Sequence, residues 1–285
     1  MYATQREDDE MPGEVTMTVG EGGLVHVMLH HPGRLNAMSR AMWRQLRTVF
    51  EAVHRSADAR CVVVAGEGGA FCAGGDISEY PGFRFDAALL RDFHENDVWG
   101  GLAAMLACDV PIVARIDGAC MGAGVEIASC CDVRIAADTS RFGAPIARLG
   151  FPMAPREAAL VARAVGDTAA RQMLLEAATF SAADMLQRGF LSRVVPPERL
   201  DEEAQASARR IAALAPAAAR MNKQTLRALH VPNQAAAPVH QAQSAMSLVA
   251  DEDAVALPPD PYAYAASAEH REGIAAFLAK RPPAF

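Results

Sequence analysis

The sequence lacks the features that mark several large classes of protein. None of its apolar runs approaches the ~18 residues that a membrane-spanning helix requires, so we expect no partner in a membrane. The first ten residues are acidic and have no apolar core of the kind that a secretory signal carries. We expect residues 1–14 to form a disordered acidic tail and the protein to be cytoplasmic. The net charge of −7 argues against binding of nucleic acid through a basic surface.

Patterns for metals and nucleotides are also absent. The six cysteines include no C-x-x-C pair and the eight histidines show no ligand spacing, so we expect reduced thiols in the core and no metal site. No Walker lysine follows a glycine-rich loop. The glycines of Gly118-x-x-x-Gly122-x-Gly124 are spaced differently from those of a dinucleotide-binding turn. This spacing disfavours a nucleotide-dependent oxidoreductase.

What is present is an alternation of short apolar runs and helical segments. Hydrophobic residues make up 51% of the 285 positions, enough for a sizeable core. The expected strands lie at 24–29, 61–65, 110–116 and 133–137, and the expected helices at 39–53, 86–107, 122–131, 156–165, 167–178, 181–188, 198–214 and 268–280. This order predicts an α/β fold followed by a helical C-terminal part.

Two glycine-rich turns, at 66–77 and 118–126, each follow an expected strand. Glycine lets the backbone turn sharply and approach a ligand closely, which leaves N–H groups free to donate. Two such turns can direct two N–H groups at one oxygen, as in an oxyanion hole. The pair of turns therefore indicates chemistry on a carbonyl compound.

A carboxylate, Glu126, follows the second turn inside an almost wholly apolar segment. A solvent-exposed stripe of a helix would explain it without function. However, the residues three and four positions away on either side form no polar stripe. Burial raises the pKa of a carboxyl group toward values useful in proton transfer, so we interpret Glu126 as an acid–base residue.

Several segments of the chain resemble those of a known family. Phe71-Cys-Ala-Gly-Gly-Asp-Ile and the segment 116–132 resemble the two signature segments of the enoyl-CoA hydratase/isomerase (crotonase) family, and 31–38 resembles its first CoA-contacting loop. The resemblance runs from about residue 15 to 285. It implies a crotonase-type spiral of repeated ββα units, with a core at 15–205 that holds the CoA and acyl sites. It also implies a helical trimerisation region at 206–285 that contributes to CoA binding.

The resemblance assigns roles to individual positions. The two backbone amides of the family's oxyanion hole fall on Gly75 and Ala123, with Glu126 as the acid–base residue. The positions that match CoA-contacting residues are Arg34, Leu35, Ala37, Ala73, Asp76, Ile77 and Ser78 and, near the C-terminus, Phe277 and Lys280. The implied substrate is an acyl-CoA thioester, with no cofactor beyond the CoA that the substrate carries. The implied assembly is a homotrimer or hexamer.

The sequence departs from the family pattern at one position that affects the reaction. Hydratases of the family use two glutamates; Glu126 matches the first, whereas Ile146 stands at the second. Glu157 is the nearest downstream acid, and its place at a helix start favours a solvated side chain over a replacement carboxylate. We therefore expect Glu126 to be the only carboxylate that catalysis requires. The segment 251–265 looks like an insertion relative to the family.

Three functions are compatible with the sequence. A hydratase (a lyase) would add water to a 2-enoyl-CoA through an enolate held in the oxyanion hole. An isomerase would move a proton between carbons with one glutamate, and a non-catalytic member would only bind acyl-CoA. The segments 78–100 and 146–157 are expected to line an apolar acyl site; the residues that suggest this are Phe83, Phe85, Trp99, Ile146 and Phe151.

Overall fold

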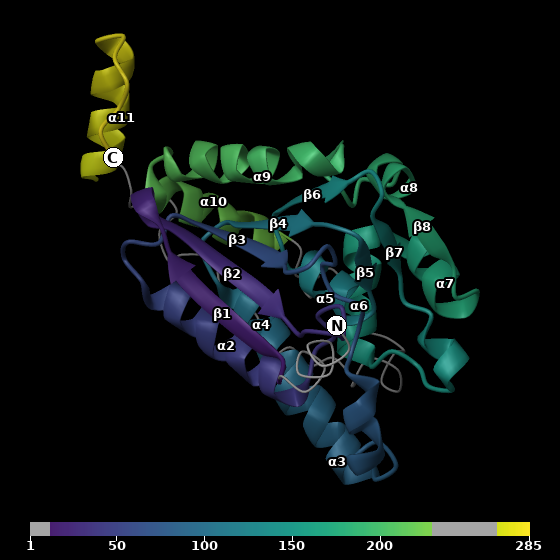
Figure 1. Ribbon diagram of the computed structural model, residues 1–285. Coiled ribbons are helices and arrows are strands. Elements are labelled where there is room, and N and C mark those ends of the chain that lie inside the picture. The colour runs from purple at the N-terminus through teal and green to yellow at the C-terminus, as the bar shows by residue number, and fades with distance from the viewer. Residues whose placement is uncertain (1–11, 230–266) are drawn as a thin grey trace, which may run out of the picture. The chain divides into compact units, whose positions relative to one another are not determined.

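The computed structural model describes residues 12–229 and 267–285. Its main sheet has six strands in the order β1-β2-β3-β4-β6-β9 (Figure 1). Their bounds are β1 Glu14–Val19, β2 Leu24–His30, β3 Cys61–Gly66, β4 Ile112–Ile116, β6 Val133–Ala137 and β9 Arg193–Val195. All neighbouring strands are parallel except β1, which is antiparallel to β2.

A second, smaller sheet contains part of the second glycine turn. It consists of β5 (Ala119–Met121), β7 (Arg141–Gly143) and β8 (Thr179–Ser181), with β7 parallel to β5 and antiparallel to β8. The chain runs β1-β2-α2, then β4-β5-α5, then β6-β7 followed by α6. These are the repeated ββα units expected from the resemblance.

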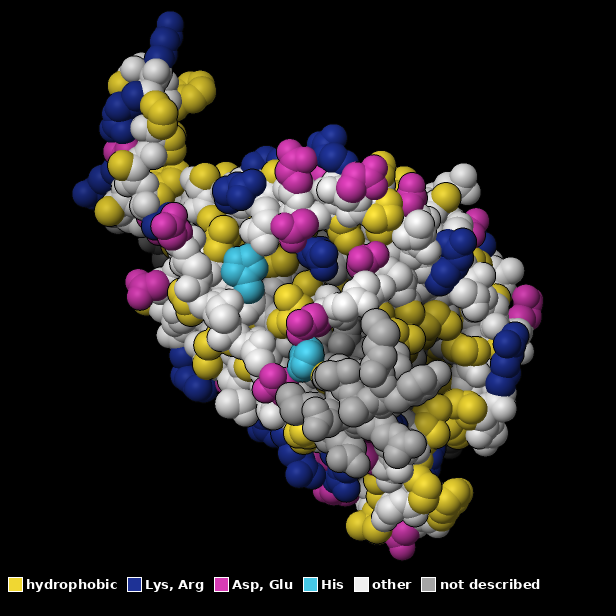
Figure 2. Space-filling model, viewed as in Figure 1, with side chains coloured by type: hydrophobic (Ala, Val, Ile, Leu, Met, Phe, Trp, Pro, Cys, Tyr) yellow, Lys and Arg dark blue, Asp and Glu magenta, His cyan; other side chains and the backbone are white. Residues whose placement is uncertain are grey.

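Helices cover both faces of the main sheet because alternate strand residues point to opposite sides. In β3, Val62 and Val64 belong to the larger core, together with Leu46 and Phe50 of α2 (Arg40–Arg55). Cys61 and Val63 belong to a smaller core with Leu200 and Ala208 of α9 (Pro197–Ala212). On the face shown in Figure 2, acidic and basic side chains are interspersed; on α9, Arg199 pairs with Glu202 and Glu203.

Most expected helices are confirmed within a few residues. Ser39 caps α2 as expected, because its hydroxyl accepts a hydrogen bond from the Met42 amide (3.2 Å). The remaining helices are α5 Ala123–Ser129, α6 Pro155–Val165, α7 Asp167–Leu175, α8 Ala182–Gln187, α10 Pro216–Leu229 and α11 Ala268–Leu278, with short 3₁₀ turns η1 Glu21–Gly23, η2 Ile77–Gly82 and η4 Ile146–Leu149. The sequence did not predict β1, β5, β7, β8 and β9, and the last four are three residues long and carry too little pattern to detect. It also did not predict α10.

The chain divides into two compact units, residues 1–212 and 213–285. Helix α9 continues across the boundary that we expected at 205/206. The insertion expected at 251–265 lies outside the described residues, as does all but the end of the tail expected at 1–14, where Glu14 begins β1.

The single helix expected at 86–107 is wrong in one respect: it is divided by a π-helical turn. The segment consists of α3 (Ala87–Asp92), η3 (Phe93–Val98, π-helical) and α4 (Trp99–Ala107). A π turn inserts one residue into the helical repeat and turns side chains that an α-helix would aim elsewhere. The spacing of polar and apolar residues in the sequence did not predict this π turn.

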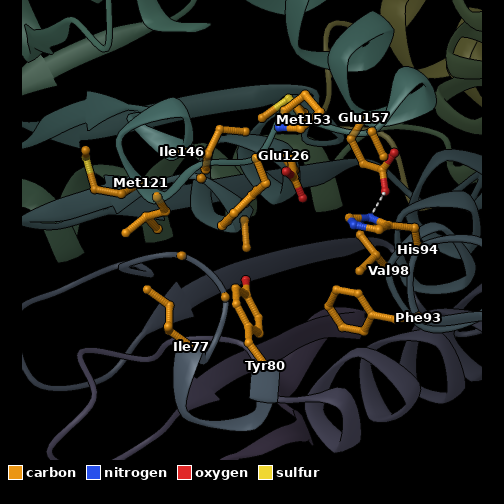
Figure 3. Close-up of a pocket in the computed structure, with 18 of the residues that line it drawn as sticks. Ile77, Tyr80, Phe93, His94, Val98, Met121, Glu126, Ile146, Met153 and Glu157 are labelled. Atoms are coloured by element: carbon orange, nitrogen blue, oxygen red, sulfur yellow. Dashed lines mark hydrogen bonds and ion pairs between the residues drawn. The ribbon is translucent and has the colours of Figure 1, made fainter. Parts of the chain in front are cut away.

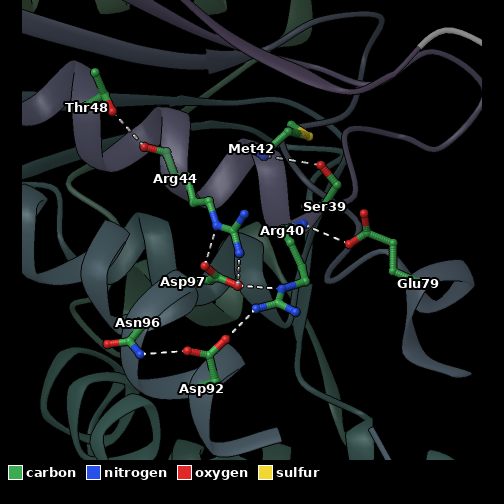
Figure 4. A network of polar contacts seen from close by, with 9 residues as sticks. All are labelled: Ser39, Arg40, Met42, Arg44, Thr48, Glu79, Asp92, Asn96 and Asp97. Carbon is green, nitrogen blue, oxygen red and sulfur yellow. Dashed lines mark hydrogen bonds and ion pairs between the residues drawn. The ribbon is translucent and has the colours of Figure 1, made fainter. Parts of the chain in front are cut away.

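An ionic network fixes the π turn against α2 (Figure 4). Asp97, whose side chain is 4% exposed, accepts hydrogen bonds from Arg40 Nε (2.5 Å) and from Arg44 Nε (2.7 Å). Arg40 also bonds to Asp92 (2.8 Å) and lies over the Phe83 and Phe93 rings. The buried carboxylate has charged donors on two sides, so it holds η3 at one place on α2.

We predict that Asp97→Asn lowers the free energy of unfolding by about 2–4 kcal/mol, because it leaves two guanidinium groups without their buried partner. Asp92→Asn is the matched control, since Asp92 is half-exposed and its pairing is screened by water. Guanidinium chloride denaturation of both variants measures the difference. Equal, small effects of the two substitutions would contradict the structural role given to Asp97.

Candidate active site

The two glycine turns meet and form one wall of a cavity of about 210 Å³. Cys72 and Cys120 pair as a short parallel bridge, in which the Cys72 amide donates to the Ala119 carbonyl and the Met121 amide donates to the Cys72 carbonyl, each at 2.9 Å. A Cβ at Gly124 would lie 2.5 Å from the Cys72 carbonyl oxygen, so this close approach requires glycine.

Two backbone amides on this wall have no acceptor among the described residues. Gly75 and Ala123 both line the cavity. The groups on either side of Gly75 bond to Met38: the Asp76 N–H donates to the Met38 carbonyl, and the Gly74 carbonyl accepts from the Met38 N–H. The Gly75 N–H therefore lies on the opposite side of this segment. Ala123 is the first residue of α5, where an N–H has no partner within the helix. The structure thus brings together the two positions that the resemblance to the family assigns to an oxyanion hole.

Glu126, in the first turn of α5, faces the same cavity (Figure 3). Its side chain makes no hydrogen bond within the described part of the chain, and the residue is 9% exposed. Burial, and secondarily the charge of Glu157, raise the pKa of Glu126 to about 8. Glu126 is therefore a protonated acid at neutral pH, poised close to the range in which it can also act as a base.

Our expectation that Glu157 is a solvated residue is wrong. Glu157 is 2% exposed and lines the cavity with Glu126, because the first turn of α6 packs against α5 instead of facing water. One of its oxygens lies 3.1 Å from His94 Nδ1. The cavity therefore holds two carboxyl groups, although Ile146 occupies the place of the family's second glutamate.

His94 is the functional candidate that sequence reasoning missed. It lies in the π turn η3, lines the cavity and meets Glu157 from the opposite wall (Figure 3). The contact is satisfied when Nδ1 carries the proton and donates it to the carboxylate. Its only signal in the sequence is the polar run 94–97 inside an otherwise helical segment. That run does not say which side chain points inward.

The rest of the cavity wall is largely apolar, as expected for an acyl site. Ile146 and Phe151 line it as expected, whereas three of the suggested residues do not. Phe83 is buried in the core, Trp99 packs against the core, and Phe85 is 89% exposed just before the Asp86 cap of α3. The apolar lining instead includes Ile77, Val98, Met121, Leu149 and Met153.

Several of the positions matched to CoA contacts form one cluster beside the first glycine turn. Asp76 Oδ1 accepts hydrogen bonds from the Ser78 amide (3.1 Å) and hydroxyl (2.7 Å), and Arg34 is 3.1 Å away. Ala73 and Ile77 line the cavity. The cluster presents a half-exposed guanidinium at the edge of the same segment that carries Gly75.

Two further matched positions belong to the 31–38 loop. Leu35, exposed and at a φ of +48°, accepts a hydrogen bond from the Ala73 amide (3.0 Å) through its carbonyl. The carbonyl of buried Ala37 lies 2.6 Å from His31 Nδ1. The first contact joins the loop to the first glycine turn, and the second lies within the loop. Phe277 and Lys280 belong to the second unit and are not placed relative to the cavity, so their role stays a prediction.

Within residues 12–229 and 267–285, no group of three or more His, Cys, Asp or Glu side chains is arranged to hold a metal ion. The six cysteines are buried and none forms a disulfide. None of the helices described here is both long and apolar enough to cross a membrane.

Known proteins share both the sequence pattern and the fold. The enoyl-CoA hydratase/isomerase family model matches residues 20–285. A probable enoyl-CoA hydratase of Mycobacterium tuberculosis is 31% identical over 91% of this chain and 93% of its own length, and the 2,3-dehydroadipyl-CoA hydratase of Escherichia coli is 31% identical over 90% and 92%.

A solved structure described as an enoyl-CoA hydratase/carnithine racemase from Magnetospirillum magneticum superposes with a TM-score of 0.84 at 32% identity, covering 98% of this chain and 97% of that one. The human enoyl-CoA hydratase domain-containing protein 3 gives a TM-score of 0.77 at 26% identity, over 96% and 100% of the two chains. The ββα spiral, the paired glycine turns and these likenesses agree: the chain belongs to the enoyl-CoA hydratase/isomerase (crotonase) family.

Proposed function

We propose that the protein adds water across the C2–C3 double bond of a 2-enoyl-CoA thioester. The observation that carries the proposal is the cavity in which two buried carboxyl groups, Glu126 and Glu157, face two backbone amides that have no acceptor among the described residues. Relatives named as enoyl-CoA hydratases support the reaction class. The steps need acid–base chemistry and no cofactor beyond the CoA of the substrate.

The amides of Gly75 and Ala123 would hold the thioester oxygen. As a nucleophile adds at C3, negative charge passes through C2 to this oxygen, and an enolate forms. Donors fixed in place beforehand stabilise that charge without reorganising. The Arg34–Asp76–Ser78 cluster on the same segment would bind the CoA portion and place the thioester at the amides.

The two carboxyl groups would divide the proton transfers. Glu157, held by His94, would take a proton from water as the water oxygen bonds to C3. Glu126, protonated at neutral pH, would give its proton to C2 as the enolate collapses. Overall, one O–H bond of water and the C2–C3 π bond break while a C–O bond and a C–H bond form. One proton then passes from Glu157 back to Glu126 to restore the site. A second buried carboxyl favours this reaction over an isomerase that works with Glu126 alone.

We predict that Glu126→Gln and Glu157→Gln each lower kcat on crotonyl-CoA by about 10²–10⁴, since each removes a general acid or base. The loss of enoyl thioester absorbance measures the rate. Glu95→Gln is the control. Glu95 lies next to His94 in the π turn η3, but it pairs with Arg156 outside the cavity.

The pattern of losses separates the alternatives. If only Glu126→Gln is inactive and Glu157→Gln keeps its rate, the single-glutamate isomerase becomes the better description. If wild type and both variants turn over no faster than background while still binding acyl-CoA, the protein is a non-catalytic binder.

The raised pKa of Glu126 predicts how activity depends on pH. The protonated form is the acid, so kcat/KM should fall as the pH rises through about 8 and Glu126 ionises. A profile that stays flat to pH 9, or that rises there, would contradict the role of Glu126 as the acid.

Folding stability gives an independent reading of the same pKa. Between about pH 4.5 and 8 the unfolded chain has Glu126 ionised and the folded chain has it protonated. Stability due to this group is therefore lost as the pH rises, by at most about 1.4 kcal/mol per pH unit. Glu126→Gln removes the titration, so the variant should gain stability relative to wild type across this range.

We also propose that the chain assembles as a homotrimer or hexamer through its second unit. On α11, Ile274, Phe277 and Leu278 are three and four positions apart and more than half exposed, so they form one apolar face. Light scattering should give three or six times the 30.3 kDa of one chain. Phe277→Glu should shift the mass downward. A wild-type mass of 30.3 kDa at micromolar concentration would contradict the proposal.

A further inference from the structure

Arg84 is the one cationic side chain that lines the cavity within the described residues. Its guanidinium carbon lies 3.5 Å from the centre of the Phe151 ring and 4.5 Å from the centre of the Tyr80 ring. The two rings are 5.9 Å apart, so the cation contacts the faces of both. Arg84 is thereby fixed in place on the wall of the cavity.

The guanidinium has no acidic partner in the described part of the chain. Arg84 makes no side-chain hydrogen bond or ion pair there, whereas nearby Arg40, Arg44 and Arg156 pair with Asp97, Asp92 or Glu95. Partial burial lowers its pKa, which records a cost of removing this cation from water. A guanidinium stays charged and carries five N–H donors suited to a carboxylate. A cation that is held in this way and has no acidic partner among residues 12–229 and 267–285 is suited to an anionic ligand.

The position of Arg84 relative to the two amides follows from Tyr80. A Cβ at Gly75 would lie 2.3 Å from the Tyr80 hydroxyl oxygen, so the hydroxyl end of Tyr80 sits directly on Gly75. The face of the same ring carries Arg84. One tyrosine side chain therefore separates Arg84 from the amide at which we place the thioester oxygen. That separation corresponds to a short acyl chain.

We propose that Arg84 binds a carboxylate at the far end of the acyl chain, so that the preferred substrates are short 2-enoyl-CoA thioesters with a terminal carboxylate. The inference rests on the function proposed above, because it takes Gly75 as the thioester end of the site. Arg84 would pair with the carboxylate through two parallel hydrogen bonds. The apolar wall formed by Ile146 and Phe151 would contact the carbons in between.

Matched substrate pairs test the inference. We would compare 2-hexenoyl-CoA and 2-pentenoyl-CoA with the same thioesters whose terminal methyl is replaced by a carboxylate. Wild type should favour the carboxylated member of at least one pair in kcat/KM by about 10–100-fold, as expected for one charge-assisted interaction. Arg84→Met should bring that ratio close to one, and Arg84→Lys should keep part of it.

Two controls make the result decisive. Arg91→Met removes an equal charge from an exposed site on α3 and should leave the ratio unchanged. The affinity for free CoA tests the other anion available, a CoA phosphate. If wild type shows no preference, or if Arg84→Met weakens free CoA and both members of a pair equally, the inference is overturned.

A binding measurement tests the role of Arg84 even if the protein does not hydrate enoyl-CoA. If no enoyl-CoA is turned over, calorimetry with adipyl-CoA and hexanoyl-CoA compares the same two ends without any reaction. Tighter binding of adipyl-CoA that is lost in Arg84→Met and retained in part in Arg84→Lys would support the inference even then. Equal binding of the two thioesters by wild type would overturn it.

Discussion

The site depends on one close approach between two backbones. The Cys72 carbonyl and Gly124 are so near that any side chain at Gly124 would collide. This contact sets the two glycine turns side by side, places the amides of Gly75 and Ala123 on one wall and starts α5 at the right point to bring Glu126 into the cavity. A displacement here would move both amides and the acid together, because α5 begins only one residue before Gly124.

The opposite wall supplies a carboxyl group although Ile146 stands at the family's second glutamate position. The family's second carboxyl position is apolar in this chain, yet α6 supplies Glu157 and the π turn supplies His94 to hold it. The π turn itself depends on Asp97 and two arginines of α2, none of which lines the cavity. In the proposed mechanism the acid–base chemistry is thus shared between elements that belong to separate parts of the sequence. The proximity of Glu126 and Glu157 is one of the reasons why the pKa of Glu126 is high.

The sequence predicted what local pattern encodes. The two glycine turns and the apolar surroundings of Glu126 can be read directly from the sequence, and the alternation of strands and helices indicated the α/β class. The resemblance to the family then placed the two amides at Gly75 and Ala123. Glu157, His94 and Arg84 could not be found in this way, because their roles arise from tertiary packing. A glutamate in the first turn of a helix looks solvated until α5 is placed against it, and an inserted π-turn residue changes which side chains face inward.

In the proposed reaction the two buried carboxyl groups add water rather than move a double bond. Mass spectrometry of the product formed from crotonyl-CoA in ¹⁸O-labelled water tests it most directly. We predict a hydroxyacyl-CoA that carries one ¹⁸O atom at C3. A product with the mass of the substrate and no label, with the double bond displaced, would contradict the account.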